Sequence, residues 1–267
     1  MRHPSPDPNW PESWKITHRY DIEEVFGPIT CRGYAYAYAN RRKQALDLIR
    51  RVAAPGARVL DVAAAQGNFS LALAEMGYRV TWNDIQADLA DYVRLKWERG
   101  DIEYAPGNVF ELNLEPDFDV VLITEIIEHV AHPDDFLCKI GKLVKPGGHV
   151  VMTTPNGGYF LNRLPKFSEC PDPSQFEAMQ FKPNSDGHIF LLHEDEIHPL
   201  AAKAGLHVEE IRLLTNFLTN GHVKMKPVLK LLPRSLVEMI ERLTQRLPGP
   251  LRPRLHASMA VLFKRPA

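Results

Sequence analysis

The stretch Arg58-Val-Leu-Asp-Val-Ala-Ala-Ala-Gln-Gly-Asn-Phe69 decides the fold of this chain. It opens with residues typical of a buried strand and then changes to small residues that leave room for a ligand beside the backbone. Gly67 permits a turn conformation that other residues adopt only at a cost. From Phe69 to Gly77 the apolar residues follow a helical spacing that ends at a glycine. The stretch therefore predicts a strand, a tight turn and a helix, an arrangement that seats a nucleotide-sized cofactor.

The turn lacks the glycine patterns that bind phosphates. Neither G-x-G-x-x-G nor G-x-x-x-x-G-K-[ST] occurs in the chain, so we do not expect a phosphate cradle. A second strand is expected at 79–85, and Asp84 stands near its carboxyl end, where an acidic residue can bind a ribose diol. Asn108 follows a third short strand at 102–104. Together with Asp61 in the first turn, these residues suit a cationic nucleoside without phosphates, such as S-adenosylmethionine.

In these features the chain resembles the class I S-adenosylmethionine-dependent methyltransferases over roughly residues 40–215. Residues 61–67 match the family's acidic residue and its alternating glycines, although alanines stand at the first two glycine positions. Alanine is still small enough to leave room for the methionine moiety. The resemblance implies a cofactor site formed by Asp61, Ala63, Ala65, Gly67, Asp84, Ile85, Asn108, Val109 and Thr124.

Alternating helices and strands continue beyond the turn. They are expected at 88–99, 102–104, 119–125, 133–144 and 149–154. Such alternation builds a parallel sheet covered on both faces. Two further strands, at 208–214 and 257–264, match the closing hairpin of the family. We expect an α/β, Rossmann-like, doubly wound seven-stranded sheet with an antiparallel edge strand, plus substrate-lid and helical insertions.

The domain organisation follows from composition. Residues 1–33 are rich in proline, tryptophan and charge and are expected to form an irregular N-terminal arm, followed by the methyltransferase domain at 34–267. The tyrosines at its start, Tyr34, Tyr36 and Tyr38, either line the cofactor mouth or belong to the core. A lid insertion at 157–190 is rich in aromatic residues and lies after the fifth strand, where ligands bind. The alternative for this segment is disorder or simple packing.

A second insertion, at 220–254, interrupts the final hairpin. Its apolar residues share one helical face opposite charged residues. They are Leu236, Met239, Ile240, Leu243 and Leu247. One interpretation is packing on the domain or on a second copy of the chain in a homodimer. The other is contact with a membrane surface through 223–247.

The reactive side chains gather in Thr124-Glu-Ile-Ile-Glu-His-Val-Ala-His-Pro133, after the expected fourth strand. In a helical turn, positions i, i+3 and i+4 share one face, so Glu125, Glu128 and His129 can converge on one point. Carboxylate and imidazole ligands suit a divalent ion such as Mg²⁺ or Mn²⁺, with Zn²⁺ as an alternative. His188, in the lid insertion, would supply a fourth ligand.

This E-x-x-E-H spacing with a distant histidine resembles two branches of the family, the ubiquinone-pathway O-methyltransferases and the small-RNA terminal 2′-O-methyltransferases. In both, the matching residues are implicated in a metal centre. The alternative is a metal-free site, in which His129 acts as a general base or only orients the substrate, and His188 is a lid histidine hydrogen-bonded to backbone.

Composition excludes several classes of protein. The 267 residues carry a formal net charge of −1, which gives no electrostatic reason to expect a nucleic-acid partner. The cysteines Cys31, Cys138 and Cys170 are scattered without metal spacing and indicate a reducing compartment. No apolar run approaches the roughly 20 residues of a transmembrane segment, and no apolar signal region is evident. We expect a cytoplasmic enzyme.

The reaction follows from the cofactor. A sulfonium methyl group is already activated, so the protein must align an acceptor oxygen and help to remove its proton. His129 as a base, or a divalent cation that lowers the pKa of the hydroxyl, would serve. We expect a metal-assisted O-methyltransferase acting on a hydroxyl of a sugar or polysaccharide precursor, because the lid is polar at 184–187. Alternatives are a phenol or quinone-precursor acceptor, an RNA terminal 2′-hydroxyl, or a non-catalytic cofactor-binding protein.

Overall fold

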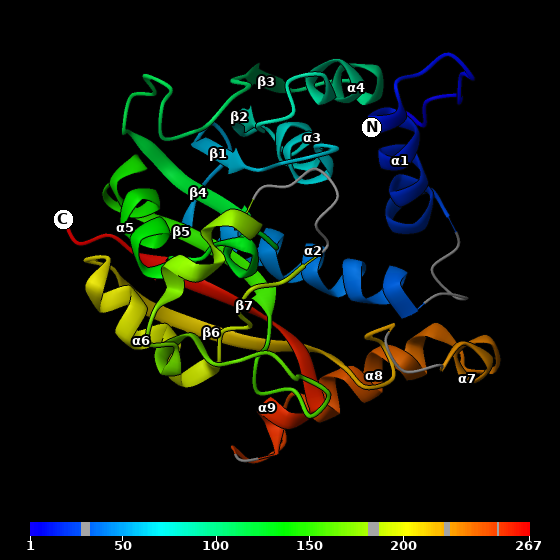
Figure 1. Cartoon of the computed structure of the whole chain (residues 1–267). Coiled ribbons are helices and arrows are strands. Elements are labelled where there is room, and N and C mark those ends of the chain that lie inside the picture. The colour runs from blue at the N-terminus through cyan, green and yellow to red at the C-terminus, as the bar shows by residue number, and fades with distance from the viewer. Residues whose placement is uncertain (28–32, 181–186, 222–224, 250) are drawn as a thin grey trace.

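A central seven-stranded sheet organises the computed structural model of the chain (Figure 1). The structure describes residues 1–27, 33–180, 187–221, 225–249 and 251–267. The strands are β1 (Arg58–Val62), β2 (Arg79–Asn83), β3 (Asp101–Tyr104), β4 (Phe118–Thr124), β5 (Val144–Pro155), β6 (His207–Asn216) and β7 (His256–Lys264). Their order is β3-β2-β1-β4-β5-β7-β6.

The first five strands are parallel, and β7 runs antiparallel to both of its neighbours, β5 and the edge strand β6. The strand order reverses between β1 and β4, which is the position where ligands bind in open α/β sheets. The expected Rossmann-like fold class is therefore confirmed.

Helices cover both faces of the sheet (Figure 1). The main ones are α2 (Gly33–Val52), α3 (Asn68–Glu75), α4 (Leu89–Lys96), α5 (Pro133–Leu143) and α6 (Glu194–Lys203). Neighbouring strand residues point to opposite faces, so Val59 packs in the core shared with α2 and α3. Leu60 packs in the core shared with α5 and α6. Burial on both faces explains the continuous apolar runs in the central strands, at 120–123 in β4 and 150–152 in β5.

The N-terminal arm is helical rather than irregular, so that expectation is wrong. It forms α1 (Glu12–Asp21) and a short π-helix, η1 (Ile22–Phe26). The buried residues of α1 are the polar Thr17 and Asp21. Because the buried face carries no apolar stripe, its helical period is invisible in the hydropathy pattern.

Additional elements surround the carboxyl edge of the sheet. They are η3 (Ile127–His129), η4 (Phe167–Glu169), η5 (Pro173–Met179), α7 (Lys226–Leu231), α8 (Arg234–Thr244) and α9 (Arg252–Leu255). The Glu241 carboxylate ties α8 to the end of β6, where it accepts hydrogen bonds from the backbone N–H groups of Thr215 and Asn216. Within the described residues, every helix is too short or too polar to cross a bilayer. Cys31 and most of the polar lid stretch 184–187 lie outside the described residues.

A comparison of two glycines distinguishes the cost of left-handed backbone from the cost of steric overlap. Gly56 (φ +90°) and Gly100 (φ +97°) both adopt left-handed backbone, which costs an L-residue about 1–2 kcal/mol. A Cβ at Gly56 meets nothing within 4 Å, whereas one at Gly100 would overlap the Ala74 carbonyl at the end of α3.

We therefore expect Gly100→Ala to lower the free energy of unfolding by about 1–3 kcal/mol more than Gly56→Ala does, because backbone must move to relieve the overlap. Urea denaturation of both variants measures the difference. Equal losses in the free energy of unfolding would show that the end of α3 moves aside without a measurable cost.

Candidate functional site

The turn after β1 has an unusual backbone. Ala63 (φ 53°) and Ala65 (φ 44°) adopt left-handed conformations, as does Gly67 (φ 68°). These are the positions at which the sequence expectation placed small residues, and left-handed alanines are uncommon outside constrained sites. A Cβ on Gly67 would lie 2.8 Å from the methyl groups of Val93, so no larger residue fits there. The turn thus exposes backbone at the carboxyl end of β1.

Neighbouring side chains brace this turn. The Asp84 carboxylate accepts hydrogen bonds from the backbone N–H groups of Ala65 and Gln86, each at 2.9 Å. The indole N–H of Trp82 donates to the Ala65 carbonyl at 3.1 Å. Burial raises the pKa of Asp84, although these hydrogen bonds favour its charged form. The acidic residue after β2 therefore holds the turn in its conformation.

Asp61 offers an unused oxygen beside the turn. Its Oδ2 accepts a hydrogen bond from Ser70 Oγ at 2.6 Å, while Oδ1 is buried and has no partner within the described residues. Burial raises the pKa of Asp61 to about 7, and the hydrogen bond from Ser70 only partly opposes it. A buried carboxylate oxygen without a partner is costly, and a cationic ligand would supply one.

A cavity of about 490 Å³ adjoins the turn. This volume lies within the usual range for small-molecule sites, about 300–1,000 Å³. Four cofactor residues expected from the sequence line it: Ala63, Ile85, Asn108 and Val109. Asp61, Ala65, Gly67 and Asp84 form or brace the turn beside it. Thr124 ends β4 and is not among the lining residues.

Some residues of this cavity were missed from the sequence. Asn83 is buried in β2, and its Nδ2 donates to the carbonyls of Ala105 and Gly107, which fixes the loop that carries Asn108. Phe110 also lines the cavity, together with residues of α5 and the lid. The position of Asn83 directly before Asp84, at the carboxyl end of the second strand, was the available signal for this residue.

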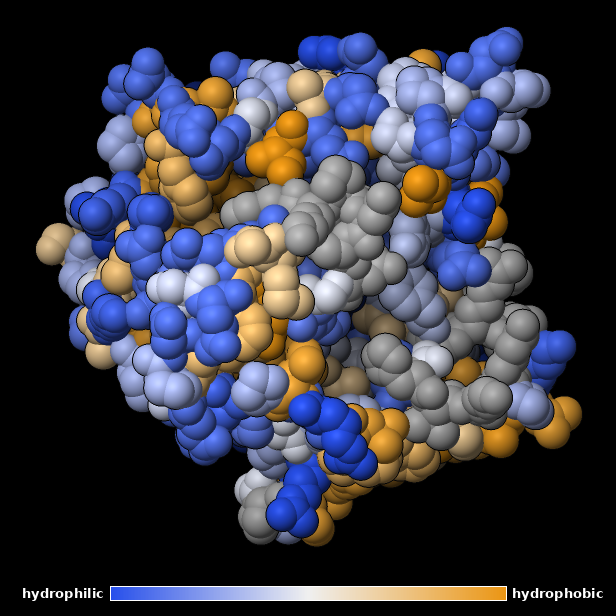
Figure 2. Space-filling view, in the orientation of Figure 1, coloured by the Kyte–Doolittle hydropathy of each residue, from blue (hydrophilic) through white to orange (hydrophobic). Residues whose placement is uncertain are grey.

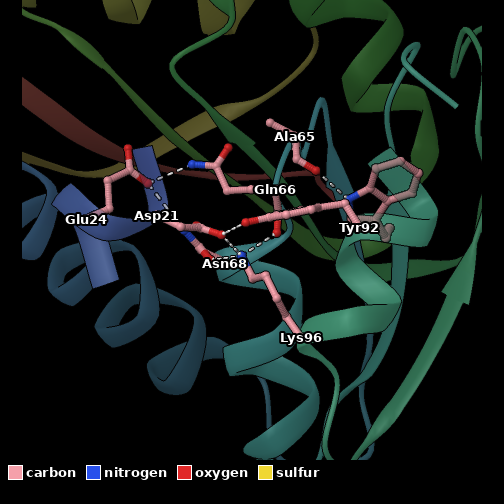
Figure 3. A network of polar contacts seen from close by, with 8 residues as sticks. Asp21, Glu24, Ala65, Gln66, Asn68, Tyr92 and Lys96 are labelled. Atoms are coloured by element: carbon pink, nitrogen blue, oxygen red, sulfur yellow. Dashed lines mark hydrogen bonds and ion pairs between the residues drawn. The ribbon is translucent and has the colours of Figure 1, made fainter. Parts of the chain in front are cut away.

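A buried lysine joins the turn to the N-terminal arm (Figure 3). Lys96 is fully buried, and its Nζ donates to Asp21 Oδ2 at 2.6 Å, to Asn68 Oδ1 at 2.6 Å and to the Gln66 carbonyl at 2.9 Å. Tyr92 Oη also donates to Asp21, at 2.8 Å. Burial lowers the pKa of Lys96 even though Asp21 favours its charged form. The ammonium group of Lys96, on α4, therefore links the N-terminal arm to the turn after β1.

Glu24 makes a second link between the arm and the turn. It accepts a hydrogen bond from Gln66 Nε2 at 2.7 Å (Figure 3). It also accepts one from Tyr34 Oη at 2.8 Å. The other two tyrosines belong to packed clusters: Tyr38 lies edge-on to Phe69, and Tyr36 packs with residues of the helical insertion. Of the two interpretations for these tyrosines, core packing fits Tyr36 and Tyr38.

Three candidate metal ligands converge after β4. Glu128, His129 and His188 each offer a ligand atom, and these atoms lie within 4.8 Å of one another. The backbone N–H of Ile189 donates to the Glu128 carbonyl at 2.7 Å, which fastens the end of the lid to this turn. His129 Nδ1 lies 3.3 Å from the Gly187 carbonyl. A proton on Nδ1 would leave Nε2 as a lone-pair donor, the usual arrangement of a ligating histidine.

The carboxylate of Glu128 fits a cation. It is 1% exposed, its Oε2 accepts a hydrogen bond from Thr154 Oγ1 at 3.0 Å, and its Oε1 is buried with no partner within the described residues. Burial first, and then the nearby charge of Glu125, raise the pKa of Glu128. One carboxylate and two imidazoles form a ligand set that divalent cations accept.

Glu125 does not join this cluster, so the expectation that it shares a helical face with Glu128 and His129 is wrong. Helical backbone begins only at Ile127, as the 3₁₀ turn η3, and Glu125 itself has φ 52°. Its Oε2 accepts a hydrogen bond from Arg41 Nη1 at 3.0 Å, and its Oε1 accepts one from Thr153 Oγ1. Glu125 is therefore an anchor for α2.

Comparisons with known proteins agree on the family. A family model described as a methyltransferase domain matches residues 36–211. The ubiquinone biosynthesis O-methyltransferase of Xanthomonas campestris pv. campestris is 33% identical over 168 residues, 61% of this chain and 66% of that relative. The chain thus spans slightly less than two thirds of that relative's length. The enzyme of the same name from Pseudomonas fluorescens is 32% identical over 183 residues, 66% of this chain and 76% of that relative.

Solved structures share the fold at lower identity. A putative sarcosine dimethylglycine methyltransferase from Galdieria sulphuraria has a TM-score of 0.60 at 14% identity, covering 96% of this chain and 99% of that chain. Phosphoethanolamine N-methyltransferase 2 of Haemonchus contortus, in complex with S-adenosyl-L-methionine, has a TM-score of 0.56 at 18% identity. The match covers 84% of this chain and 53% of that chain. At such identities the likeness shows the fold alone.

The buried lysine leads to a prediction of stability. We expect Lys96→Met to lower the free energy of unfolding by about 3–5 kcal/mol, because Asp21 is left buried without its cation. Lys15→Met on α1 removes an exposed i,i+3 contact with Glu12 and should cost less than about 1 kcal/mol. In urea denaturation, Lys96→Met/Asp21→Leu should recover part of the loss. Equal losses for Lys96→Met and Lys15→Met would contradict the role of the buried charge.

Asp61 leads to a prediction of pH dependence. Its raised pKa means that the folded state binds more protons than the unfolded state between about pH 4 and 7, so this group's contribution to stability falls as pH rises through that window. We expect Asp61→Asn to raise the free energy of unfolding by about 1–3 kcal/mol at pH 8, with the gain shrinking towards pH 4. Asp91→Asn, an exposed control, should change little at either pH. A gain independent of pH would refute the ionisation argument.

Proposed function

The chain belongs to the class I S-adenosylmethionine-dependent methyltransferases, and on that premise we propose that it transfers a methyl group to a hydroxyl oxygen of a small-molecule acceptor with the help of a divalent cation. The observation that carries the proposal is the convergence of Glu128, His129 and His188 at the carboxyl end of β4, next to the cofactor turn. The relatives named as O-methyltransferases support oxygen as the atom that is methylated.

The residues around the turn fit S-adenosylmethionine. The unpartnered Oδ1 of Asp61 can accept hydrogen bonds from a cationic ligand, and the left-handed alanines expose backbone without side-chain bulk. Asp84, buried after the carboxyl end of β2, would bind the ribose diol. Ile85, Asn108 and Val109 line the adjoining cavity and would contact the base. When bound, the cofactor supplies the activated methyl group.

The acceptor hydroxyl must lose its proton for attack. Glu128, His129 and His188 would hold a divalent cation, which would supply positive charge that lowers the pKa of the acceptor hydroxyl. Glu128 is fixed by Thr154, and His129 is oriented by the Gly187 carbonyl. His188 is delivered by the lid, whose Ile189 is hydrogen-bonded to the same turn. Ordering of the lid and completion of the cluster are therefore linked.

The acceptor we propose is a phenol with a neighbouring oxygen, such as a catechol. The sequence expectation favoured a sugar hydroxyl, and a vicinal sugar diol would present similar oxygens to a cation. The relatives' names, which place them in ubiquinone biosynthesis, favour the phenol.

The decisive experiment measures transfer of labelled methyl from S-adenosylmethionine to a catechol and to a sugar diol. We expect transfer to the catechol, loss of transfer in excess EDTA, and recovery with Mg²⁺ or Mn²⁺. Glu128→Gln and His188→Ala should each lower kcat by about 100-fold or more, because each removes a ligand rather than one of the outer contacts that cost 10–100-fold. His198→Ala, an exposed histidine on α6, is the matched control and should leave kcat unchanged.

Three outcomes would contradict parts of the proposal. No transfer to any acceptor, with no binding of S-adenosylmethionine by calorimetry, would remove the methyl-transfer function. Full activity in excess EDTA together with an inactive His129→Ala would identify His129 as a general base without a metal. Transfer to the sugar diol alone would reinstate the sugar acceptor.

A further inference from the structure

The insertion between β6 and β7 presents apolar side chains to solvent. Leu231 is 85% exposed, Leu243 is 55% exposed and Leu251 is 52% exposed, and Val228 and Met239 are exposed beside them. Figure 2 shows apolar atoms along the lower edge of the molecule, where Figure 1 places α7, α8 and α9. Exposed leucines in such a row are unusual on a surface that faces only water.

These side chains are not needed to hold the insertion in place. On α8, Val237 and Glu241 make the inward contacts, the former in an apolar cluster and the latter to the end of β6. Met239 and Leu243 lie one helical turn apart on a different face of the helix. The helix therefore has one face that packs on the domain and a second apolar face turned outward.

The same region carries an excess of positive charge. Residues 226–254 contain seven lysines and arginines but only two glutamates, in a chain whose formal net charge is −1. Glu238 pairs with Arg234, and Glu241 is turned inward. Four exposed cations make no ion pair within the described residues: Lys230, Arg242, Arg246 and Arg254.

We propose that this surface, the α7–α9 face, binds the surface of an anionic lipid bilayer. The α7–α9 face consists of the apolar Val228, Leu231, Met239, Leu243 and Leu251 and the cationic Lys230, Arg242, Arg246 and Arg254. Apolar side chains flanked by unpaired cations match an interface of acyl chains and anionic headgroups. This inference goes beyond the proposed function, because binding to lipid requires no methyl transfer.

Charge argues against a second copy of the chain as the occupant. A two-fold dimer through this face would bring the same surface together twice, and therefore would oppose cations with cations. Anionic headgroups would instead neutralise them. Lipid is thus the partner whose charge and apolarity both complement the α7–α9 face.

The α7–α9 face lies next to a segment that leads to the carboxyl end of β5. The backbone N–H of Phe160 donates to the Arg254 carbonyl at 3.1 Å, and Phe160 and Leu161 are both exposed. This segment begins at Asn156, beside the carboxyl end of β5, and Asn156 Nδ2 donates to the Pro253 and His256 carbonyls. A bilayer under α9 would therefore lie next to the acceptor side of the sheet.

Vesicle flotation with the full chain tests the proposal. We expect binding to vesicles containing about one third phosphatidylglycerol and little binding to phosphatidylcholine alone. Raising the salt until the Debye length falls from about 10 Å to about 3 Å should release most of the protein. Arg242→Glu/Arg246→Glu should lower the partition coefficient at least about tenfold, and Leu231→Ser/Leu243→Ser should do so as well.

Matched controls lie elsewhere on the surface. Arg99→Glu/Lys142→Glu makes the same change of charge, and Leu95→Ser/Ile16→Ser removes two exposed apolar residues from α4 and α1. Neither control should alter partitioning, and thermal melts should show that all variants fold. The proposal is overturned by absence of binding to the anionic vesicles, or by controls that reduce it as much as the face variants. A wild-type dimer that Leu231→Ser/Leu243→Ser dissociates, without vesicle binding, would assign the face to self-association.

Discussion

The positive charge of Lys96, held away from water, is the constraint on which the site depends. Its ammonium is satisfied only when Asp21 of the arm, Asn68 of α3 and the Gln66 carbonyl of the turn are all in place. Displacing the arm would leave that charge buried and unpaired, which costs far more than a surface ion pair. The turn after β1 is thus supported by the N-terminal arm, which precedes it in the chain. Glu24 of the arm makes a second contact with the turn, through the side chain of Gln66.

The site itself is assembled from local arrangements that do not favour stability. Two alanines adopt left-handed backbone, and buried oxygens of Asp61 and Glu128 have no partner within the described residues. Such costs persist where the surrounding structure enforces them, and they mark positions where a ligand would complete the bonding. Both oxygens lie at the carboxyl end of the sheet near its reversal of strand order. In the proposed reaction, the oxygen of Asp61 would face the cationic cofactor and the oxygen of Glu128 would face the divalent cation.

The insertions extend this core in two directions. The lid brings His188 to Glu128 and His129, and the helices between β6 and β7 carry the α7–α9 face. Phe160 connects the two regions through its contact with Arg254. The two insertions are therefore in contact at the carboxyl edge of the sheet.

The sequence by itself determined the sheet, its helices and the cofactor turn, because strand and helix periods and the glycine of a tight turn are local properties. It also indicated Glu128, His129 and His188 as candidate metal ligands, and the structure brings these three side chains together. The tertiary structure alone decided that Glu125 pairs with Arg41, 84 positions away, and that Lys96 pairs with Asp21, 75 positions away. The helical arm was hidden because its buried face is polar, and the left-handed backbone at Glu125 broke the helical spacing assumed for its neighbours. Pairings between distant polar residues leave no periodic trace in a single chain, since only folding brings the partners together.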